Sequence, residues 1–303
     1  MAMDQQSESM NYEEEFILNS RGNKLFTCRW APKEHAPKAL IFICHGECSI
    51  SMRGINTRPR LFLPDRNTDS RTNIQIPPLD WCEPDMPFTG LIMKATEDHL
   101  AGDATYRTSV TSSQTARTIS RVFAKPENTE KKRFLYGVSM GGGVALLLHR
   151  KAPTYWDGAV LLAPMCKISD DMRPHPIVVS ALKMLCSVAP SWSIIPTPDI
   201  IDKVCKDPEM RKQVRSNPYI YRGKLPLKTC HELLVVSLDI EKNLDQEASS
   251  SDKTFKLYPG MWHALTAELP DDVERVYSDI ICWLDERADC TGSASETSGT
   301  PSV

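Results

Sequence analysis

Two patterns of apolar residues follow one another along most of this chain: continuous runs and helical spacing. Continuous apolar runs at Ala39–Cys44, Phe134–Tyr136 and Gly158–Pro164 are typical of strands that are buried on both faces of a parallel sheet. Helical spacing follows the second run directly and recurs at Ile177–Val188, Ile200–Val214, Glu232–Asn243 and Asp271–Arg287. Strands and helices that alternate in this way predict an α/β fold with a mostly parallel sheet and helices on both faces.

Strands of another kind are expected near the two ends of the chain. Alternating residues at Glu15–Ile17 and Leu25–Trp30 predict a hairpin, with the polar segment 19–23 as its turn. A further short strand is expected at Thr254–Tyr258, just before the sequence PGMWH. The segment before residue 12 is polar and is interpreted as a leader.

The middle of the chain, residues 55–124, has a different character. Arg, Pro, Thr, Ser and Asp dominate there, no helical or strand period persists, and Pro77, Pro78, Pro84 and Pro87 interrupt any element that begins. A segment of this length without secondary structure is unusual inside a compact domain. We therefore interpret it as an aberrant or disordered insert.

One glycine-rich turn carries the clearest chemistry. The apolar run 134–136 enters Gly137-Val138-Ser139-Met140-Gly141, and an Ala- and Leu-rich helical pattern follows. In a G-x-S-x-G nucleophile elbow of this kind, the serine stands on a strained turn between strand and helix. Gly137 and Gly141 are expected to be required because a Cβ atom there would meet neighbouring backbone. The helix N-terminus favours negative charge that develops beside Ser139.

Composition and charge narrow the class of partner. The net charge of −3 over 303 residues, without a basic stripe, argues against nucleic acid. The polar, acidic start lacks the features of a secretory signal, and no apolar run reaches the ~20 residues of a membrane span. The ten cysteines are expected to be reduced thiols, which favours a cytoplasmic location. Cys44, His45 and Cys48 lack a second ligand pair, so neither a metal ion nor a cofactor is expected.

Several motifs together resemble one family. They are His45-Gly46 after a buried strand, the GVSMGG elbow, the sequence LLAPMCKI before an apolar insertion, and YPGMWH before the last helix. In this combination the chain is similar to the monoacylglycerol lipase-like α/β-hydrolases, and most similar to the plant branch with caffeoylshikimate esterases and lysophospholipase-like proteins. The resemblance covers residues 12–53, 125–240 and 249–287. It implies an incomplete α/β-hydrolase domain over 12–288, with a helical cap at 167–230 and a disordered tail at 289–303.

The same resemblance implies roles for individual residues. Ser139 would attack an ester carbonyl while His263 accepts its proton, and the backbone N–H groups of Met140 and Glu47 would stabilise the oxyanion. The implied partner is a small-molecule ester or a lipid monoester. Peripheral association with membranes and the oligomeric state are left open. Peptidase activity is a third hypothesis, because the fold alone does not select the substrate.

The acid that should complete this site has no match in the chain. The family places it on a strand between the predicted helix at 232–243 and the expected strand at 254–258, where only a few polar residues stand. Asp239 and Asp245 lie nearby, but neither follows an apolar strand, and neither is assigned the role. The alternative hypothesis is therefore a catalytically impaired or inactive α/β-hydrolase-like protein.

A frameshifted or mis-spliced gene model would explain the unusual middle segment. Residues 79–123, back-translated with allowed codons and shifted by one base, include the sequence RLVRAGYAVYGIDYEGHGRSSG. This run resembles the strand and GHG-x-S loop that the family carries between its HG and elbow motifs. Whether residues 54–124 are a genuine insert or a reading-frame artefact is left open at this stage.

Overall fold

The fold is described from a computed structural model. It describes residues 10–18, 24–33, 36–44, 88–95, 128–168, 173–195, 199–216, 224–247 and 249–288. The strands of this part are β1 (Met10–Leu18), β2 (Lys24–Pro32), β3 (Ala39–Cys44), β4 (Phe88–Ala95), β5 (Lys132–Val138) and β6 (Gly158–Leu162). Its helices are α4 (Met140–Lys151), α5 (Pro176–Val188), α6 (Ile201–Val204), α7 (Pro208–Ser216), α8 (Leu227–Glu247), the 3-10 helix η5 (Leu265–Ala267) and α9 (Pro270–Ala288).

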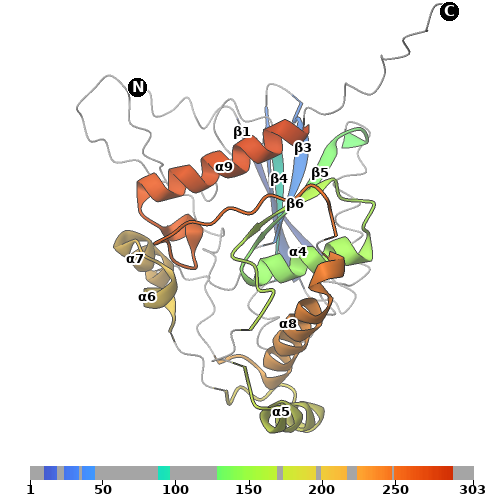
Figure 1. The fold of residues 1–303 in the computed structure, drawn as a ribbon, viewed down its shortest axis with the longest axis vertical. Helices are drawn as coiled ribbons and strands as arrows, with labels where there is room; N and C mark the ends of the chain where they lie inside the picture. Colours follow the sequence, from blue (N-terminus) through green and yellow to red (C-terminus); the bar gives the residue numbers. More distant parts are fainter. Residues whose placement is uncertain are drawn as a thin grey trace, which may run out of the picture.

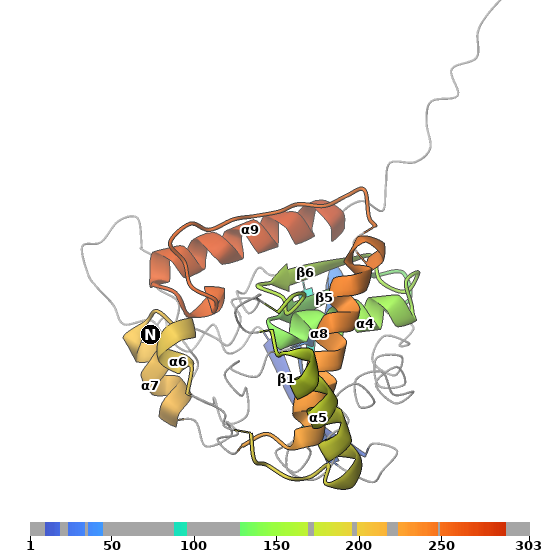
Figure 2. The same ribbon diagram turned by 60° about the horizontal axis from the view of Figure 1, so that its bottom comes forward.

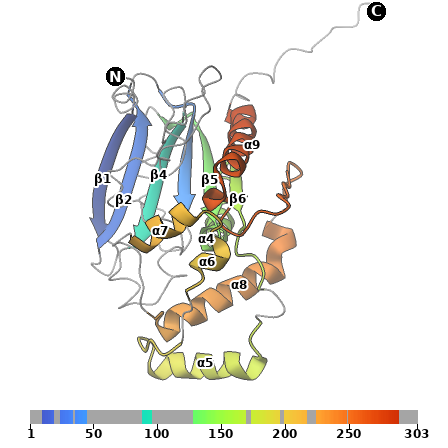
Figure 3. The same ribbon diagram turned by 90° about the vertical axis from the view of Figure 1, so that its left-hand side faces the viewer.

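The six strands form one sheet in the order β1-β2-β4-β3-β5-β6, which Figure 3 shows from β1 on the left to β6 on the right. β4, β3, β5 and β6 run parallel to one another. β1 and β2 form the predicted hairpin, and β2 joins the parallel part through an antiparallel pairing with β4. The predicted α/β fold with a mostly parallel sheet is confirmed.

Strand β3 shows why both faces of the sheet need helices. All six of its residues are buried, and alternate side chains point to opposite faces. Ile41 and Ile43 belong to the cluster that includes Val276 and Leu284 of α9. Leu40 and Phe42 instead pack with Val144, Ala145 and Leu148 of α4. The sheet therefore lies between α9 and α4, as Figure 1 shows.

Outside α4 lies a further helical layer. Leu146 and Leu147 of α4 pack against Val236 and Ile240 of α8. α5 lies against α8, which it overlaps in Figure 2, and Figure 3 shows it on the side of α8 away from the sheet. α5 leaves most of its apolar residues in solvent, and only Cys186 of this helix is buried. Residues of α5, α6 and α7 come from the expected cap, and they are helical as the sequence pattern predicted.

Three predicted boundaries are wrong. β1 begins at Met10, inside the expected leader, because it pairs with β2 as far as Pro32. The middle segment contains strand β4, whose backbone ladders to both β2 and β3 supply an order that the residue pattern did not indicate. The predicted helix Ile200–Val214 is two helices, since Pro208 has no N–H to continue a helix and stands at the start of α7.

The strand expected at Thr254–Tyr258 is also absent from the structure. This segment is extended but pairs with no strand of the described sheet. The family's acid strand, which would lie next to it, has no counterpart in the sequence, and a lone extended segment has no ladder to join. The expected turn at 19–23 and the tail at 289–303 lie outside the described residues.

Candidate active site

Ser139 stands between strand β5 and helix α4 in a strained backbone conformation. Its φ of 53° and ψ of −117° are rare for a residue with a side chain. Three backbone hydrogen bonds hold it there. Its N–H donates to Leu162 O at 2.9 Å, and its carbonyl accepts from Gly142 N at 2.9 Å and Met165 N at 2.8 Å. The turn is therefore tied to the loop that follows β6.

Small residues let the chain pass through this turn. A Cβ atom on Gly137 would lie 2.7 Å from Gly141 O and 2.7 Å from Gly142 Cα. A Cβ atom on Gly142 would lie 2.4 Å from Pro164 Cβ. The predicted need for Gly137 is confirmed. The need for Gly142 was not predicted. The three successive glycines at the start of the helix were a signal in the sequence that could have indicated it.

His263 lies against this serine. Its Nε2 is 2.9 Å from Ser139 Oγ, across 124 positions of sequence. The segment before it turns at Gly260, whose φ of +82° suits glycine, and the segment after it enters η5. Burial lowers the pKa of the His263 imidazole below its ordinary value. A neutral imidazole in this position can accept the hydroxyl proton.

The other ring nitrogen of His263 has no carboxylate partner in the part of the chain that the structure describes. Asp239 lies on α8, where its carboxylate pairs with Arg150 at 2.5 Å and accepts a hydrogen bond from Asn243. Asp245 is exposed near the end of the same helix. Neither residue is placed as the acid of a triad.

Of the two expected oxyanion donors, Met140 lies within the described residues. Met140 is the first residue of α4, so its backbone N–H belongs to the positive end of the helix directly beside Ser139. Glu47 lies outside the described residues. Among the residues with described positions, no group of three His, Cys, Asp or Glu side chains is arranged to hold a metal ion.

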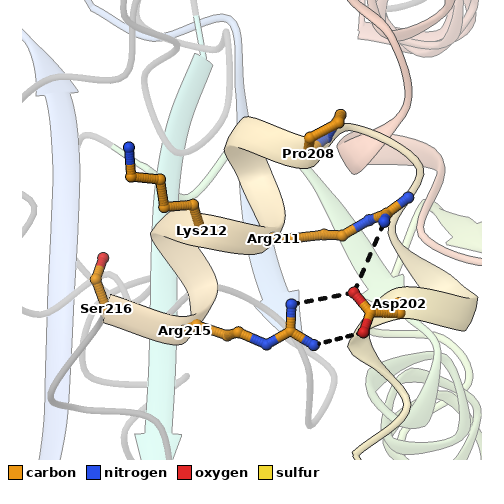
Figure 4. Close-up of a pocket in the computed structure, with 6 residues that line it drawn as sticks. All are labelled: Asp202, Pro208, Arg211, Lys212, Arg215 and Ser216. Carbon is orange, nitrogen blue, oxygen red and sulfur yellow. Dashed lines mark hydrogen bonds and ion pairs between the residues drawn. The ribbon is translucent and has the colours of Figure 1, made fainter.

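An open groove of about 540 Å³ lies on α6 and α7, and its lining residues include neither Ser139 nor His263. Figure 4 shows its charged wall, where Arg215 contacts Asp202 at 2.8 Å and Arg211 approaches the same carboxylate at 3.7 Å. Hydrogen bonds from Arg215 lower the pKa of Asp202. Asp202 thus offsets only part of the positive charge of Arg211, Lys212 and Arg215 on this wall.

Comparison with known proteins extends the resemblance. Residues 116–246 match the family model described as serine aminopeptidase, S33. Caffeoylshikimate esterase from Arabidopsis thaliana is 34% identical over 188 residues, which cover 53% of this chain and 57% of that protein. Monoglyceride lipase from Homo sapiens is 24% identical over 310 residues, with 92% of each chain covered. The chain is therefore similar to the monoglyceride lipase-like α/β-hydrolases.

Solved structures support the α/β-hydrolase fold for this chain. A soluble variant of monoglyceride lipase from Saccharomyces cerevisiae superposes with a TM-score of 0.67, at 15% identity, over 91% of this chain and 95% of that one. The monoacylglycerol lipase of Paleococcus ferrophilus gives 0.63 at 15% identity, over 88% and 100%. The match to the plant esterase, by contrast, spans little more than half of that relative's length.

Within the described part of the chain, none of the helices combines the length and apolar composition that crossing a membrane requires.

Proposed function

We propose that the chain is a serine carboxylic ester hydrolase that forms an acyl-enzyme on Ser139. The observation that carries this proposal is the 2.9 Å contact between Ser139 Oγ and His263 Nε2 at a strained strand-to-helix turn. A serine hydroxyl alone is a weak nucleophile, and an adjacent base is what activates it. The combination is the chemistry of acyl transfer.

The mechanism follows from these two side chains. Ser139 Oγ attacks the ester carbonyl while its proton passes to His263 Nε2, and the carbonyl oxygen becomes an oxyanion. The N–H of Met140 donates to that oxyanion, a contact of a kind that is worth about 3 kcal/mol. The tetrahedral intermediate expels the alcohol, which takes the proton from His263. Water then repeats the sequence, releases the acid and restores Ser139.

The proposed substrates are lipid monoesters or small aromatic esters. Support comes from relatives whose names are caffeoylshikimate esterase and monoglyceride lipase. In this proposal residues 167–230 form a cap, and the exposed apolar side of α5 faces the acyl chain. A cytoplasmic protein that associates peripherally with membranes, with a lysophospholipase-like role in lipid metabolism, is consistent with this substrate class.

A second candidate is an α/β-hydrolase-like protein with impaired catalysis. The observation that favours it is the lack of a carboxylate on His263 within the described residues. Replacing that carboxylate costs about four decades in kcat in a well-studied protease. The frameshift hypothesis belongs to this candidate. A cDNA that encodes residues 54–124 in the stated frame would rule the frameshift out.

A fluorophosphonate probe separates the two candidates. The purified full chain is expected to become labelled, and Ser139→Ala is expected to abolish labelling because the probe reacts only with an activated serine. His263→Gln should reduce labelling strongly, whereas Ser187→Ala, which removes an exposed hydroxyl on α5, should leave it unchanged. No labelling of the full chain favours the impaired protein. Labelling that persists in Ser139→Ala contradicts the proposed nucleophile.

A further inference from the structure

The segment that carries His263 contains a buried glutamate. Glu268 is 1% exposed, five residues after the histidine and just before α9 begins. A buried carboxylate carries a large desolvation cost unless it is paired and hydrogen-bonded. Its partners therefore show what it does in the fold.

The two carboxylate oxygens of Glu268 have different partners. Oε1 accepts a hydrogen bond from the backbone N–H of Trp262, the residue directly before the histidine. Oε2 forms an ion pair with Lys206 Nζ at 3.2 Å. The same ammonium donates to Gly260 O at 3.1 Å. Glu268 and Lys206 thus hold the backbone on the N-terminal side of His263 at two points.

The backbone on the other side of His263 is fixed to the same region. Ala264 N donates to Val204 O at 2.9 Å, and Ala267 O accepts from Lys206 N at 3.2 Å and Asp207 N at 3.1 Å. Cys205 and Met210 pack with Ala267 in one small apolar cluster. The end of α6 and the segment that joins it to α7 therefore contact the His263 segment on both sides of the histidine.

We infer that Glu268 is a positioning residue for His263 and that it acts through the ion pair with Lys206. This role gains weight because no carboxylate holds the imidazole itself in the described part of the chain. The orientation of the ring toward Ser139 then depends on how firmly the backbone of 260–264 is held. The ion pair also couples the α6–α7 segment to the reacting pair, so movement of that segment changes the placement of His263.

The inference rests on the proposed function, and its test uses two readouts. Backbone hydrogen exchange reports whether the 260–264 segment is held, whether or not Ser139 reacts. The rate constant of fluorophosphonate labelling reports whether His263 is placed to activate Ser139. Three variants of the full chain are compared with the natural sequence: Glu268→Gln, Lys206→Met and Lys206→Arg.

Glu268→Gln and Lys206→Met are each expected to raise exchange at Trp262 and to lower the labelling constant about tenfold. Lys206→Arg keeps the positive charge and should recover most of the loss. The control is Glu232→Gln, which alters another buried glutamate paired with a lysine, Lys228, inside α8. This control should change neither readout, because its contacts lie within the α5–α8 layer.

Unchanged exchange at Trp262 in both Glu268→Gln and Lys206→Met would overturn the inference, and so would faster exchange with unchanged labelling. If Glu268→Gln does not fold, the inference is tested by the two lysine variants. Lys206→Met should then show the loss, and Lys206→Arg should recover most of it. If the natural chain takes up no label, the proposed function fails, and the exchange data alone decide whether Glu268 holds the segment.

Discussion

Ser139 has its unusual backbone conformation in a turn whose neighbouring glycines leave no room for a Cβ atom. The closest approaches involve Gly137 and Gly142, where an added methyl group would meet backbone or the ring of Pro164. Overpacking of this kind cannot be relieved by rotating a flexible side chain. Stability and the geometry of the nucleophile are therefore linked at these two glycines.

Gly142→Ala is expected to lower the free energy of unfolding by about 1–3 kcal/mol, because the new Cβ would lie 2.4 Å from Pro164 Cβ. Urea-induced unfolding measures this loss. Gly143→Ala is the matched control in the same helical turn. There the nearest atom is the side-chain tip of Ile240 at 3.3 Å, and alanine improves helix propensity by about 1 kcal/mol. Equal losses in the two variants would contradict the packing argument.

His263 determines how the proposed chemistry depends on pH. Burial lowers the pKa of this imidazole below its ordinary value, and only the neutral ring accepts the Ser139 proton. The labelling constant should therefore be flat near pH 7 and fall as the pH drops through the folded-state pKa. Because the unfolded chain binds the proton more tightly, this histidine also contributes stability above its unfolded pKa that is lost toward acid pH.

A pH profile of the labelling constant tests this prediction. The inflection is expected below about 6.5, the ordinary pKa of histidine. An inflection above that value would mean that a negative charge stabilises the imidazolium.

Strand β6 forms an edge of the sheet and has no strand paired to its outer side in the described structure. The extended segment 254–258 does not cover it. Phe255 and Leu257, which alternate along that segment, are 84% and 86% exposed. Unpaired edges and exposed apolar segments are templates for association between chains.

The double variant Phe255→Ser and Leu257→Ser is therefore expected to reduce self-association while leaving the unfolding transition nearly unchanged. Static light scattering over a concentration series measures the association. Thr254→Ser, in the same segment, is the control and should scatter like the natural chain. If the double variant associates as strongly as the control, another surface is responsible.

The elements show where sequence patterns are informative. β3, α4 and α9 were predicted closely because their own residues carry the signal, a continuous apolar run or helical spacing. β4 could not be predicted, since its order comes from ladders with strands far away in sequence. The strand predicted at 254–258 is wrong for the opposite reason. Its residues favour a strand, but the described sheet offers no neighbouring strand with which it pairs.

The same distinction holds at the candidate site. The elbow was predictable because glycine, serine and the flanking apolar runs are adjacent in sequence. The placement of His263 against Ser139 rested on chain order and resemblance, and the structure brings the two together. Glu268 was missed because its partners, Lys206 and the Trp262 backbone, depend on how the α6–α7 segment folds back. The only local sign of its role in the sequence was an acidic residue close before Pro270.

For the molecule as a whole, the sheet between α9 and α4 is the main source of stability. Leu284 of α9 is fully buried against this sheet, whereas Val188 of α5 is 83% exposed. Leu284→Ala should therefore lower the free energy of unfolding by about 2–5 kcal/mol. Val188→Ala should change it by less than about 0.5 kcal/mol. Thermal and urea unfolding measure both, and comparable losses would show that α5 is buried in solution.

Two cysteines let the opening of this sheet be followed chemically. Cys44 ends β3 and is buried, and burial raises the pKa of its thiol, so the reactive thiolate is scarce in the folded state. Cys282 is exposed on α9. A thiol reagent should modify Cys282 at once and Cys44 only when the central strand separates from its helices. Mass spectrometry of the two peptides then gives the opening rate of the core without any introduced probe.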